Sequence, residues 1–185
     1  MSPDHDYSWK LVFGGAGGAG KTTLIQRFLS DEFSPDTKMT VGVQFHTGNL
    51  RFKEKRFLLM LWDLGGQEKF RFIQDQYIQG SVGGFVFFDM SRLGTLQQVE
   101  NWVKMFRKNL PPTAPIVLVG SKLDLIKDEE RADIDALANQ YVEDLGLTGY
   151  TQTSSKTGTN VYEAVTYVVD LLLFNLSQGI KVMGV

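Results

Sequence analysis

The chain has 185 residues, of which 43% are hydrophobic and 22% are charged, and it contains no cysteine. This length favours one domain around one core, and the lack of cysteine excludes a disulfide framework, a thiolate zinc site and a cysteine nucleophile. The formal net charge is −2, so there is no global basic field, and we expect no nucleic acid as a partner.

The two ends of the sequence lack the usual targeting signals. Residues Met1 to Asp6 are polar and acidic, unlike the basic and then apolar start of a signal peptide. No apolar run reaches the ~18 residues that indicate a membrane span, and Ile180 to Val185 contain no cysteine for a prenyl group. We expect a cytoplasmic protein with no lipid anchor encoded in this chain, and membrane association only through a missing tail or a partner.

Short apolar runs alternate with helical patterns, which favours an α/β fold with a mainly parallel sheet. In chain order, the patterns predict strands at 9–13, 41–52, 57–62, 84–88, 116–119 and 150–153. They predict helices from about residue 21 and at about 93–110, 129–145 and 160–177, with a weakly helical segment up to residue 80. The charged turn Lys53 to Arg56 is too short for a parallel crossover, so the strands beside it should be antiparallel.

The same pass along the chain predicts the domain organisation. No internal repeat, low-complexity tract or interdomain linker divides the sequence. We expect a flexible segment at 1–8, a single domain at 9–178 and a short tail at 179–185.

The first chemical motif is the glycine-rich stretch that satisfies G-x-x-x-x-G-K-[ST] from Gly15 to Thr22. Glycines let such a loop wrap a phosphate so that successive backbone N–H groups point at its oxygens. Lys21 would supply a cation for the β- and γ-phosphates, and the Thr22 hydroxyl can ligate Mg²⁺. The alternative is a flexible linker before a lysine, and the strand before the motif and the helix after it argue against that alternative.

A second motif, Asp63 to Glu68, follows a predicted strand. A carboxylate at this place can hold Mg²⁺ through a water molecule, as in other nucleotide-binding proteins. The backbone N–H of Gly66 could meet a γ-phosphate, and Gln67 could orient an attacking water. Taken alone, Asp-x-x-Gly after a strand is equally typical of an ordinary turn.

Two further motifs are Ser121 to Asp124 and Thr153 to Lys156, and each follows a predicted strand. By itself, a charged tetrapeptide after a strand is usually a solvated loop. Their placement gives them weight, because ligands of open α/β sheets bind outside the carboxyl ends of the strands.

In order and spacing, these motifs resemble those of the small GTPases of the Ras superfamily, over about residues 9–176. Within the superfamily the chain is most similar to the Rab branch, since Thr40 to Phe45 resemble the Rab effector region and Lys69 to Ile73 the second Rab switch. The resemblance implies a small G domain of the P-loop NTPase class: a six-stranded, mostly parallel sheet with one antiparallel strand and helices on both faces.

The resemblance also implies roles for individual residues. Phe33 would lie against the guanine ring, Lys122 over its plane, and the Asp124 carboxylate would accept hydrogen bonds from the base. Mg²⁺ would be held by Thr22, Thr40 and, through water, Asp63. The expected catalytic residues are Gln67, Lys21, Thr40 and Gly66. The expected nucleotide-binding residues are Gly15, Ala16, Gly17, Gly18, Ala19, Gly20, Lys21, Thr22, Thr23, Phe33, Thr40, Gly66, Ser121, Lys122, Asp124, Ser154, Ser155 and Lys156. The expected effector surface is Phe45, Trp62, Phe70 and Tyr77, with core packing of these aromatics as the alternative.

Three departures from the family pattern stand out. Ser121 replaces the usual asparagine and should weaken guanine binding, because a hydroxyl cannot form the two-sided bridge of an amide. Leu64 and Gly65 replace Thr-Ala, and we expect a more mobile second switch. The carboxyl-terminal cysteines that anchor Rab proteins are missing from this chain.

We therefore expect a guanine-nucleotide switch that binds GTP and GDP with Mg²⁺ and slowly hydrolyses GTP. Between Phe33 and Thr40 the only cation is Lys38, so fast turnover would need an arginine from a partner. By resemblance, the partners are effector proteins, an exchange factor and a GTPase-activating protein. The alternatives are a nucleotide-locked GTP/GDP-binding scaffold with little hydrolysis and an ATP-specific P-loop enzyme.

Overall fold

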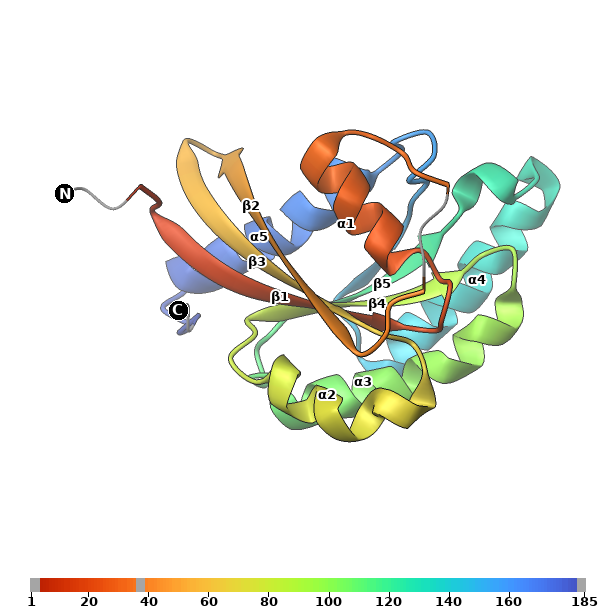
Figure 1. Ribbon diagram of the computed structural model, residues 1–185, viewed down its shortest axis with the longest axis horizontal. Helices are drawn as coiled ribbons and strands as arrows, with labels where there is room; N and C mark the ends of the chain where they lie inside the picture. The colour runs from red at the N-terminus through yellow and green to blue at the C-terminus, as the bar shows by residue number, and fades with distance from the viewer. Residues whose placement is uncertain (1–3, 36–38, 183–185) are drawn as a thin grey trace.

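The computed structural model describes residues 4–35 and 39–182. Six strands form one sheet in the order β2-β3-β1-β4-β5-β6 (Figure 1). Their bounds are β1 Tyr7–Gly15, β2 Val43–Phe52, β3 Lys55–Leu64, β4 Gly83–Asp89, β5 Ile116–Ser121 and β6 Gly149–Gln152. Only β2, which pairs with β3, runs antiparallel to its neighbour in this sheet. The predicted fold class, including the single antiparallel strand, is confirmed.

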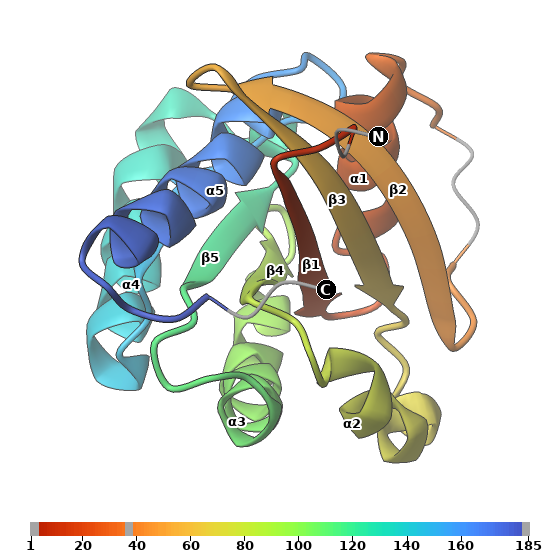
Figure 2. The same ribbon diagram turned by 90° about the vertical axis from the view of Figure 1, so that its left-hand side faces the viewer.

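Helices cover both faces of the sheet (Figures 1 and 2). The helices are α1 Lys21–Ser30, α2 Arg71–Ile78, α3 Val99–Asn109, α4 Asp128–Leu145 and α5 Val161–Ser177. Short 3₁₀ segments are η1 Glu68–Phe70, η2 Leu93–Gln98 and η3 Leu123–Leu125. Helices α1 and α5 pack on one face, and α2, α3 and α4 supply buried side chains to the other. Within the described part of the chain, no helix combines the length and the apolar character needed to cross a bilayer.

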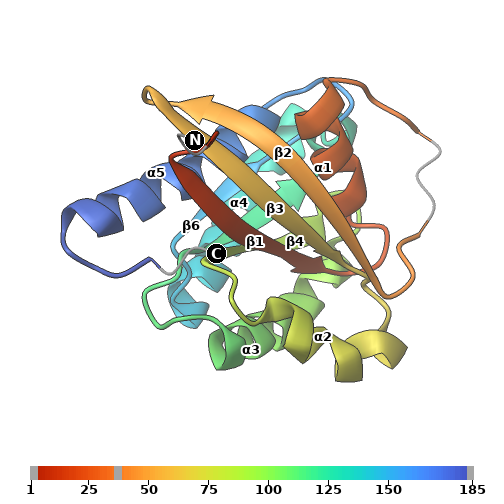
Figure 3. The ribbon, with the colours of Figure 1, turned by 60° about the vertical axis from the view of Figure 1, so that its left-hand side comes forward.

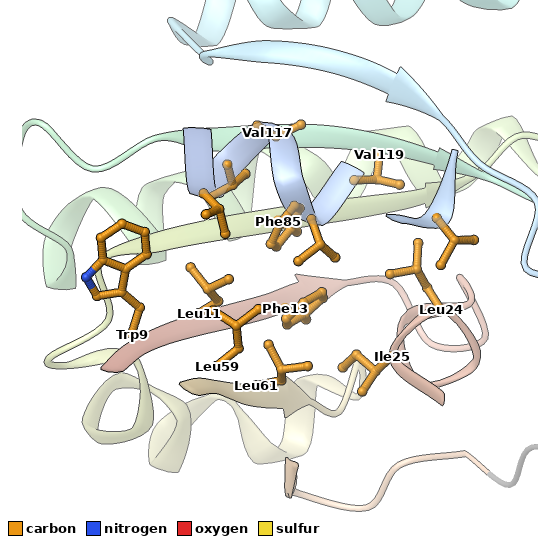
Figure 4. Packing of buried hydrophobic residues seen from close by; sticks show 14 of the residues in the cluster. Trp9, Leu11, Phe13, Leu24, Ile25, Leu59, Leu61, Phe85, Val117 and Val119 are labelled. Carbon is orange, nitrogen blue, oxygen red and sulfur yellow. The ribbon is translucent and has the colours of Figure 1, made fainter. Parts of the chain in front are cut away.

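The core is divided by the sheet into two clusters because side chains alternate along each strand. In β1, Leu11 and Phe13 enter the cluster beneath α1 and α5, whereas Val12 enters the cluster on the opposite face. Figure 4 shows the first cluster, where Leu24 of α1 and Phe85 of β4 point toward the same interior as the β1 side chains. A strand buried on both faces tolerates little movement, so β1 and β4 give rigid support to the loops at their carboxyl ends.

The amino-terminal boundary differs from the prediction. Tyr7 and Ser8 belong to β1 and pair with Phe57 and Leu58, and the backbone N–H of Arg56 donates to the Asp6 carboxylate at 2.7 Å. Figure 3 shows the start of β1 near the turn of the β2–β3 hairpin. The flexible segment expected at 1–8 is therefore wrong at its carboxyl end, where pairing with β3 orders the chain, and residues 1–3 lie outside the described residues.

The helix predicted over 93–110 is also divided differently. Residues 93–98 form the 3₁₀ segment η2, and α3 begins only at Val99. The Thr95 hydroxyl explains the tight winding, because it accepts a hydrogen bond from the Asp89 N–H at 2.9 Å and donates to the Arg92 carbonyl at 2.8 Å. At the other end of the chain, Val182 packs against the first cluster, and residues 183–185 of the expected tail lie outside the described residues.

Candidate functional site

A cavity of about 710 Å³ opens at the edge of the sheet where the parallel strands end. It is bounded by the loop after β1, the segment before β2, and the loops after β3, β5 and β6. Its lining residues are Gly17, Gly18, Ala19, Gly20, Lys21, Thr22, Thr23, Phe33, Ser34, Pro35, Met39, Thr40, Gly66, Ser121, Lys122, Asp124, Leu125, Ser155 and Lys156. All four predicted motifs therefore meet at one cavity.

The prediction and the lining differ at a few positions. Ser34, Pro35, Met39 and Leu125 line the cavity although their side chains carry no chemical signal in the sequence. Only their places beside Phe33, Thr40 and Asp124 could have indicated them. Among the described residues, five that were predicted for the site do not line the cavity: Gly15, Ala16, Asp63, Gln67 and Ser154.

The loop after β1 wraps its own lysine. Lys21 is buried, and its Nζ donates to the carbonyl oxygens of Gly15 and Ala16, each at 3.0 Å. The wrapping requires positive φ angles at Gly15, Gly18 and Gly20, a backbone region that glycine enters without strain. Burial lowers the pKa of Lys21 to about 8, while the nearby Asp63 charge acts in the opposite direction. Gly15 and Ala16 thus hold the lysine from behind the cavity wall.

Two hydroxyl groups and one carboxylate converge beside this lysine. The Thr40 hydroxyl donates to Asp63 Oδ2 at 3.0 Å, the Thr22 hydroxyl donates to the same oxygen, and the two hydroxyl oxygens lie 2.8 Å apart. Asp63 is fully buried, and burial raises the pKa of its carboxyl group against the hydrogen bonds from Thr22 and the charge of Lys21. Asp63 Oδ1 has no hydrogen-bond partner among the described residues.

The glycines after β3 allow close contacts between backbones. A Cβ on Gly66 would lie 2.2 Å from the Gly17 nitrogen, and a Cβ on Gly65 would lie 2.6 Å from the Thr40 oxygen. The Gly65 N–H donates to the Gly42 oxygen at 2.8 Å, and the buried Gln74 side chain donates to the Gly65 oxygen at 2.7 Å. Gly65 therefore links the loop after β3 to the segment before β2.

The opposite end of the cavity is built from side-chain hydrogen bonds. Ser154 is buried, and its hydroxyl donates to Asp124 Oδ1 at 2.5 Å, so it positions a cavity residue from outside the lining. Lys122 has a left-handed backbone (φ 64°) and its Nζ lies 2.7 Å from Asp89 Oδ2. The Ser121 hydroxyl donates to the Phe88 carbonyl at 3.0 Å.

Comparison with known proteins agrees with this geometry. A family model described as "Ras family" matches residues 10–173. The chain belongs to the Ras family. Similar proteins include Ras-related protein RABA1e of Arabidopsis thaliana, 36% identical over 171 residues that cover 90% of this chain and 75% of the relative. Ras-related protein Rab11B of Nicotiana tabacum is 37% identical, with the same coverage of both chains. Ras-related protein YPTC6 of Chlamydomonas reinhardtii is 35% identical over a match that covers 96% of this chain and 81% of the relative.

Membership in the Ras family implies a GTP-binding switch, and these relatives confirm the predicted similarity to Rab-type proteins. In this Ras-family chain, three aromatic rings predicted for the effector surface lie together. The ring centroids of Phe45 and Trp62 are 4.9 Å apart, and those of Trp62 and Tyr77 are 5.5 Å apart. Phe45 is 51% exposed, whereas Trp62, Tyr77 and Phe70 are half-buried. The cluster is therefore open to solvent mainly at Phe45.

Proposed function

We propose that this Ras-family chain is a molecular switch that binds GTP and GDP with Mg²⁺ and slowly hydrolyses GTP. The observation that carries the proposal is the single cavity wall shared by Lys21 and Thr22 at one end and by Lys122 and Asp124 at the other. A nucleoside polyphosphate needs both ends at once, because its phosphates seek backbone N–H groups and a cation while its base seeks polar and flat partners.

Guanine would be selected at the Asp124 end of the cavity. A carboxylate accepts two hydrogen bonds, which matches the adjacent N1–H and exocyclic amine of guanine and does not match adenine. The hydrogen bond from Ser154 fixes the carboxylate before the base arrives. Preorganisation of this kind reduces the entropy lost on binding, so it partly compensates for the serine at position 121.

The residues beside Lys21 suit Mg²⁺. The donor set of Thr22, Thr40 and Asp63 consists only of oxygen, which this ion prefers, and the unpartnered buried Oδ1 of Asp63 indicates that the set is not complete in itself. When bound, Mg²⁺ would neutralise charge on the β- and γ-phosphates. The two hydroxyls would bind the ion and the Asp63 carboxylate would orient them or a bound water.

Hydrolysis would depend on placement and charge rather than on a covalent intermediate. Lys21 and the loop N–H groups would hold the phosphates, Gly66 would meet the γ-phosphate through its backbone N–H, and Gln67 would orient the water. Lys38, the cation of the first switch region, lies outside the described residues. An arginine supplied by an activating protein would raise the slow intrinsic rate.

Effector proteins would bind over the aromatic cluster of Phe45, Trp62 and Tyr77. This cluster lies on β2, β3 and α2, the elements that adjoin Thr40 and Gly66, so changes at the γ-phosphate can reach it through short connections. Exposed aromatic rings are typical anchors at protein interfaces. Exchange factors and activating proteins are expected to contact the segment before β2, which contains Thr40, and the loop after β3, which contains Gly66.

The test is to identify the nucleotide that leaves the purified protein on denaturation, and then to measure single-turnover GTP hydrolysis. We expect GDP, and an intrinsic rate below about 10⁻² s⁻¹, since no arginine of the switch region assists. Gln67→Leu should lower that rate at least about tenfold, because it removes the water-orienting amide. Gln140→Leu, on the exposed side of α4, is the matched control and should leave the rate unchanged.

Other outcomes would contradict the proposal in separable ways. Bound GTP together with equal rates for the wild type and Gln67→Leu would favour a nucleotide-locked scaffold. Adenine nucleotide in the denatured sample would favour an ATP-specific P-loop enzyme. A rate near ~1 s⁻¹ without any partner would disprove the need for an external arginine.

A further inference from the structure

A buried carboxylate connects the two ends of the cavity. Asp89, the last residue of β4, has no exposed surface, and its Oδ2 lies 2.7 Å from Lys122 Nζ and 2.8 Å from Arg92 Nε. Its Oδ1 accepts hydrogen bonds from the Ser91 N–H at 2.9 Å and the Ser91 hydroxyl at 2.6 Å. Burial raises the pKa of Asp89, but the hydrogen bonds from Lys122, Ser91 and Arg92 outweigh it and the pKa falls.

Arg92 extends this connection to the phosphate loop, Gly15 to Thr22. While Nε contacts Asp89, Nη2 of the same guanidinium donates to the Gly17 carbonyl at 3.2 Å. A Cβ on Gly18 would lie 3.2 Å from the same Nη2, so the guanidinium lies directly against the loop. The planar fork of an arginine can make both contacts at once, and the single ammonium of a lysine cannot make them in the same geometry.

The backbone of Arg92 is itself held in place. Its N–H donates to the Asp89 carbonyl at 2.9 Å, and its carbonyl accepts the hydrogen bond from Thr95. The Thr95 side chain is buried, and its hydroxyl oxygen also accepts a hydrogen bond from the Asp89 N–H. The guanidinium therefore extends from a fixed point at the end of β4, although half of the side chain is exposed.

The neighbouring Ser121 does not form such a tether. Its side chain lies beside the loop, 3.5 Å from where a Cβ on Gly20 would be, yet its hydroxyl donates to the Phe88 carbonyl of β4. The single proton of the hydroxyl is thus used within the sheet. A fixed strand end and a loop of small residues are joined by Arg92.

We propose that Arg92 is a positioning residue for the phosphate loop. Its guanidinium holds the Gly17 carbonyl outward, so that the N–H groups of the loop face a bound nucleotide and the nucleotide dissociates slowly. This role rests on the proposed binding of guanine nucleotide. Arg92 is not part of the cavity lining itself, but it contacts the lining residue Gly17, so it acts through the loop backbone. Removal of one charge-assisted hydrogen bond should speed release about tenfold.

The experiment measures the release of fluorescently labelled GDP, chased with excess unlabelled GDP in the presence of Mg²⁺. Four proteins are compared: the wild type, Arg92→Ala, Arg92→Lys and Arg107→Ala. Arg107 is the matched control, because it is also exposed and donates to a backbone carbonyl, that of Gly146, away from the cavity. We expect release about tenfold faster for Arg92→Ala, an intermediate rate for Arg92→Lys and the wild-type rate for Arg107→Ala.

Amide hydrogen exchange of residues 15–20 in the same proteins separates positioning from general stability. Faster exchange confined to these residues in Arg92→Ala supports the proposal. Unchanged release from Arg92→Ala, or exchange that is faster everywhere together with a lower melting temperature, overturns it. A wild-type protein that binds no guanine nucleotide overturns the proposed function as well, whereas normal wild-type binding with no effect of Arg92→Ala overturns only the role of Arg92.

Discussion

The two ends of the cavity are built by different means. At the end proposed to bind the base, Asp124 accepts a hydrogen bond from Ser154, and Lys122 forms an ion pair with Asp89. At the end proposed to bind the phosphates, Thr22 and Thr40 also donate to Asp63, but the loops themselves meet through backbone atoms, because Gly65 and Gly66 have no Cβ to keep them apart. A site can therefore be fixed by adding polar partners or by removing side chains.

The difference has consequences for how each end responds to change. A side-chain hydrogen bond fixes one group in one orientation, which suits the recognition of a base that does not change. Backbone contacts such as those of Gly65 and Gly66 are all lost together when the loop moves, which suits a region that must respond to the presence of a γ-phosphate. Three substitutions or conditions test this contrast.

The largest effect is expected at Asp124. Asp124→Asn replaces one acceptor with an N–H₂ donor that faces the donors of guanine, so affinity for GDP should fall by about 10³-fold or more. The same variant should gain affinity for xanthosine diphosphate, whose base has a carbonyl where guanine has the amine. Titration with fluorescent forms of both nucleotides measures the exchange of preference. Equal losses for both would indicate that Asp124 supports the loop rather than binds the base.

A smaller effect, on rate rather than affinity, is expected at Gly66. The new Cβ of Gly66→Ala would clash with the backbone at Gly17, so the loop after β3 must move, and Gln67, which is proposed to orient the water, moves with it. A displacement of this order should lower single-turnover GTP hydrolysis about 10²-fold while GDP affinity changes far less. Gly94→Ala is the control, because a Cβ at Gly94 meets no atom within 4 Å of it. Wild-type hydrolysis by Gly66→Ala would contradict the glycine contact.

The smallest effect is a pH dependence that belongs to the phosphate end alone. The pKa of Lys21 is lowered to about 8 by burial, so the ammonium loses its proton as the pH rises through that value. A bound phosphate favours the charged form, so binding takes up a proton, and GDP affinity should fall about tenfold from pH 7 to pH 9. Calorimetric titrations at several pH values measure the slope. Lys21→Arg does not titrate in this range, and a slope that persisted in it would come from another group.

Much of this molecule was predictable because its signals are local. The strand, glycine loop and helix around Lys21 are consecutive within residues 7–30, and the buried run of β4 needs no partner to be recognised. The contacts that refine the site are not local. Arg92 meets a loop 75 positions earlier, and Ser154 positions a carboxylate 30 positions earlier. Nothing in the composition of the segments around Arg92 and Ser154 indicates which side chain contacts the distant loop.

The errors have the same origin. Tyr7 and Ser8 have no strand pattern of their own and become ordered because β3 supplies a parallel partner. The helical periodicity of 93–110 is genuine over α3, but the buried Thr95 hydroxyl competes for the backbone groups at its start. Gly65 is the point at which two loops join, which a sequence position alone does not reveal, and the greater mobility expected of its loop stays a prediction.

The strand order has a consequence for synthesis of the chain. Because β1 lies between β3 and β4, the sheet around the phosphate loop has all its strands once residue 89 has left the ribosome. The strands β5 and β6, whose loops are proposed to bind the base, follow only at residues 116–152. Synthesis proceeds from the amino terminus, so the residues proposed to distinguish one base from another emerge after every strand beside the phosphate loop. The helix α5, which covers one face of the same strands, emerges after them. Under the proposed function, the residues that would select the nucleotide are therefore among the last that translation adds.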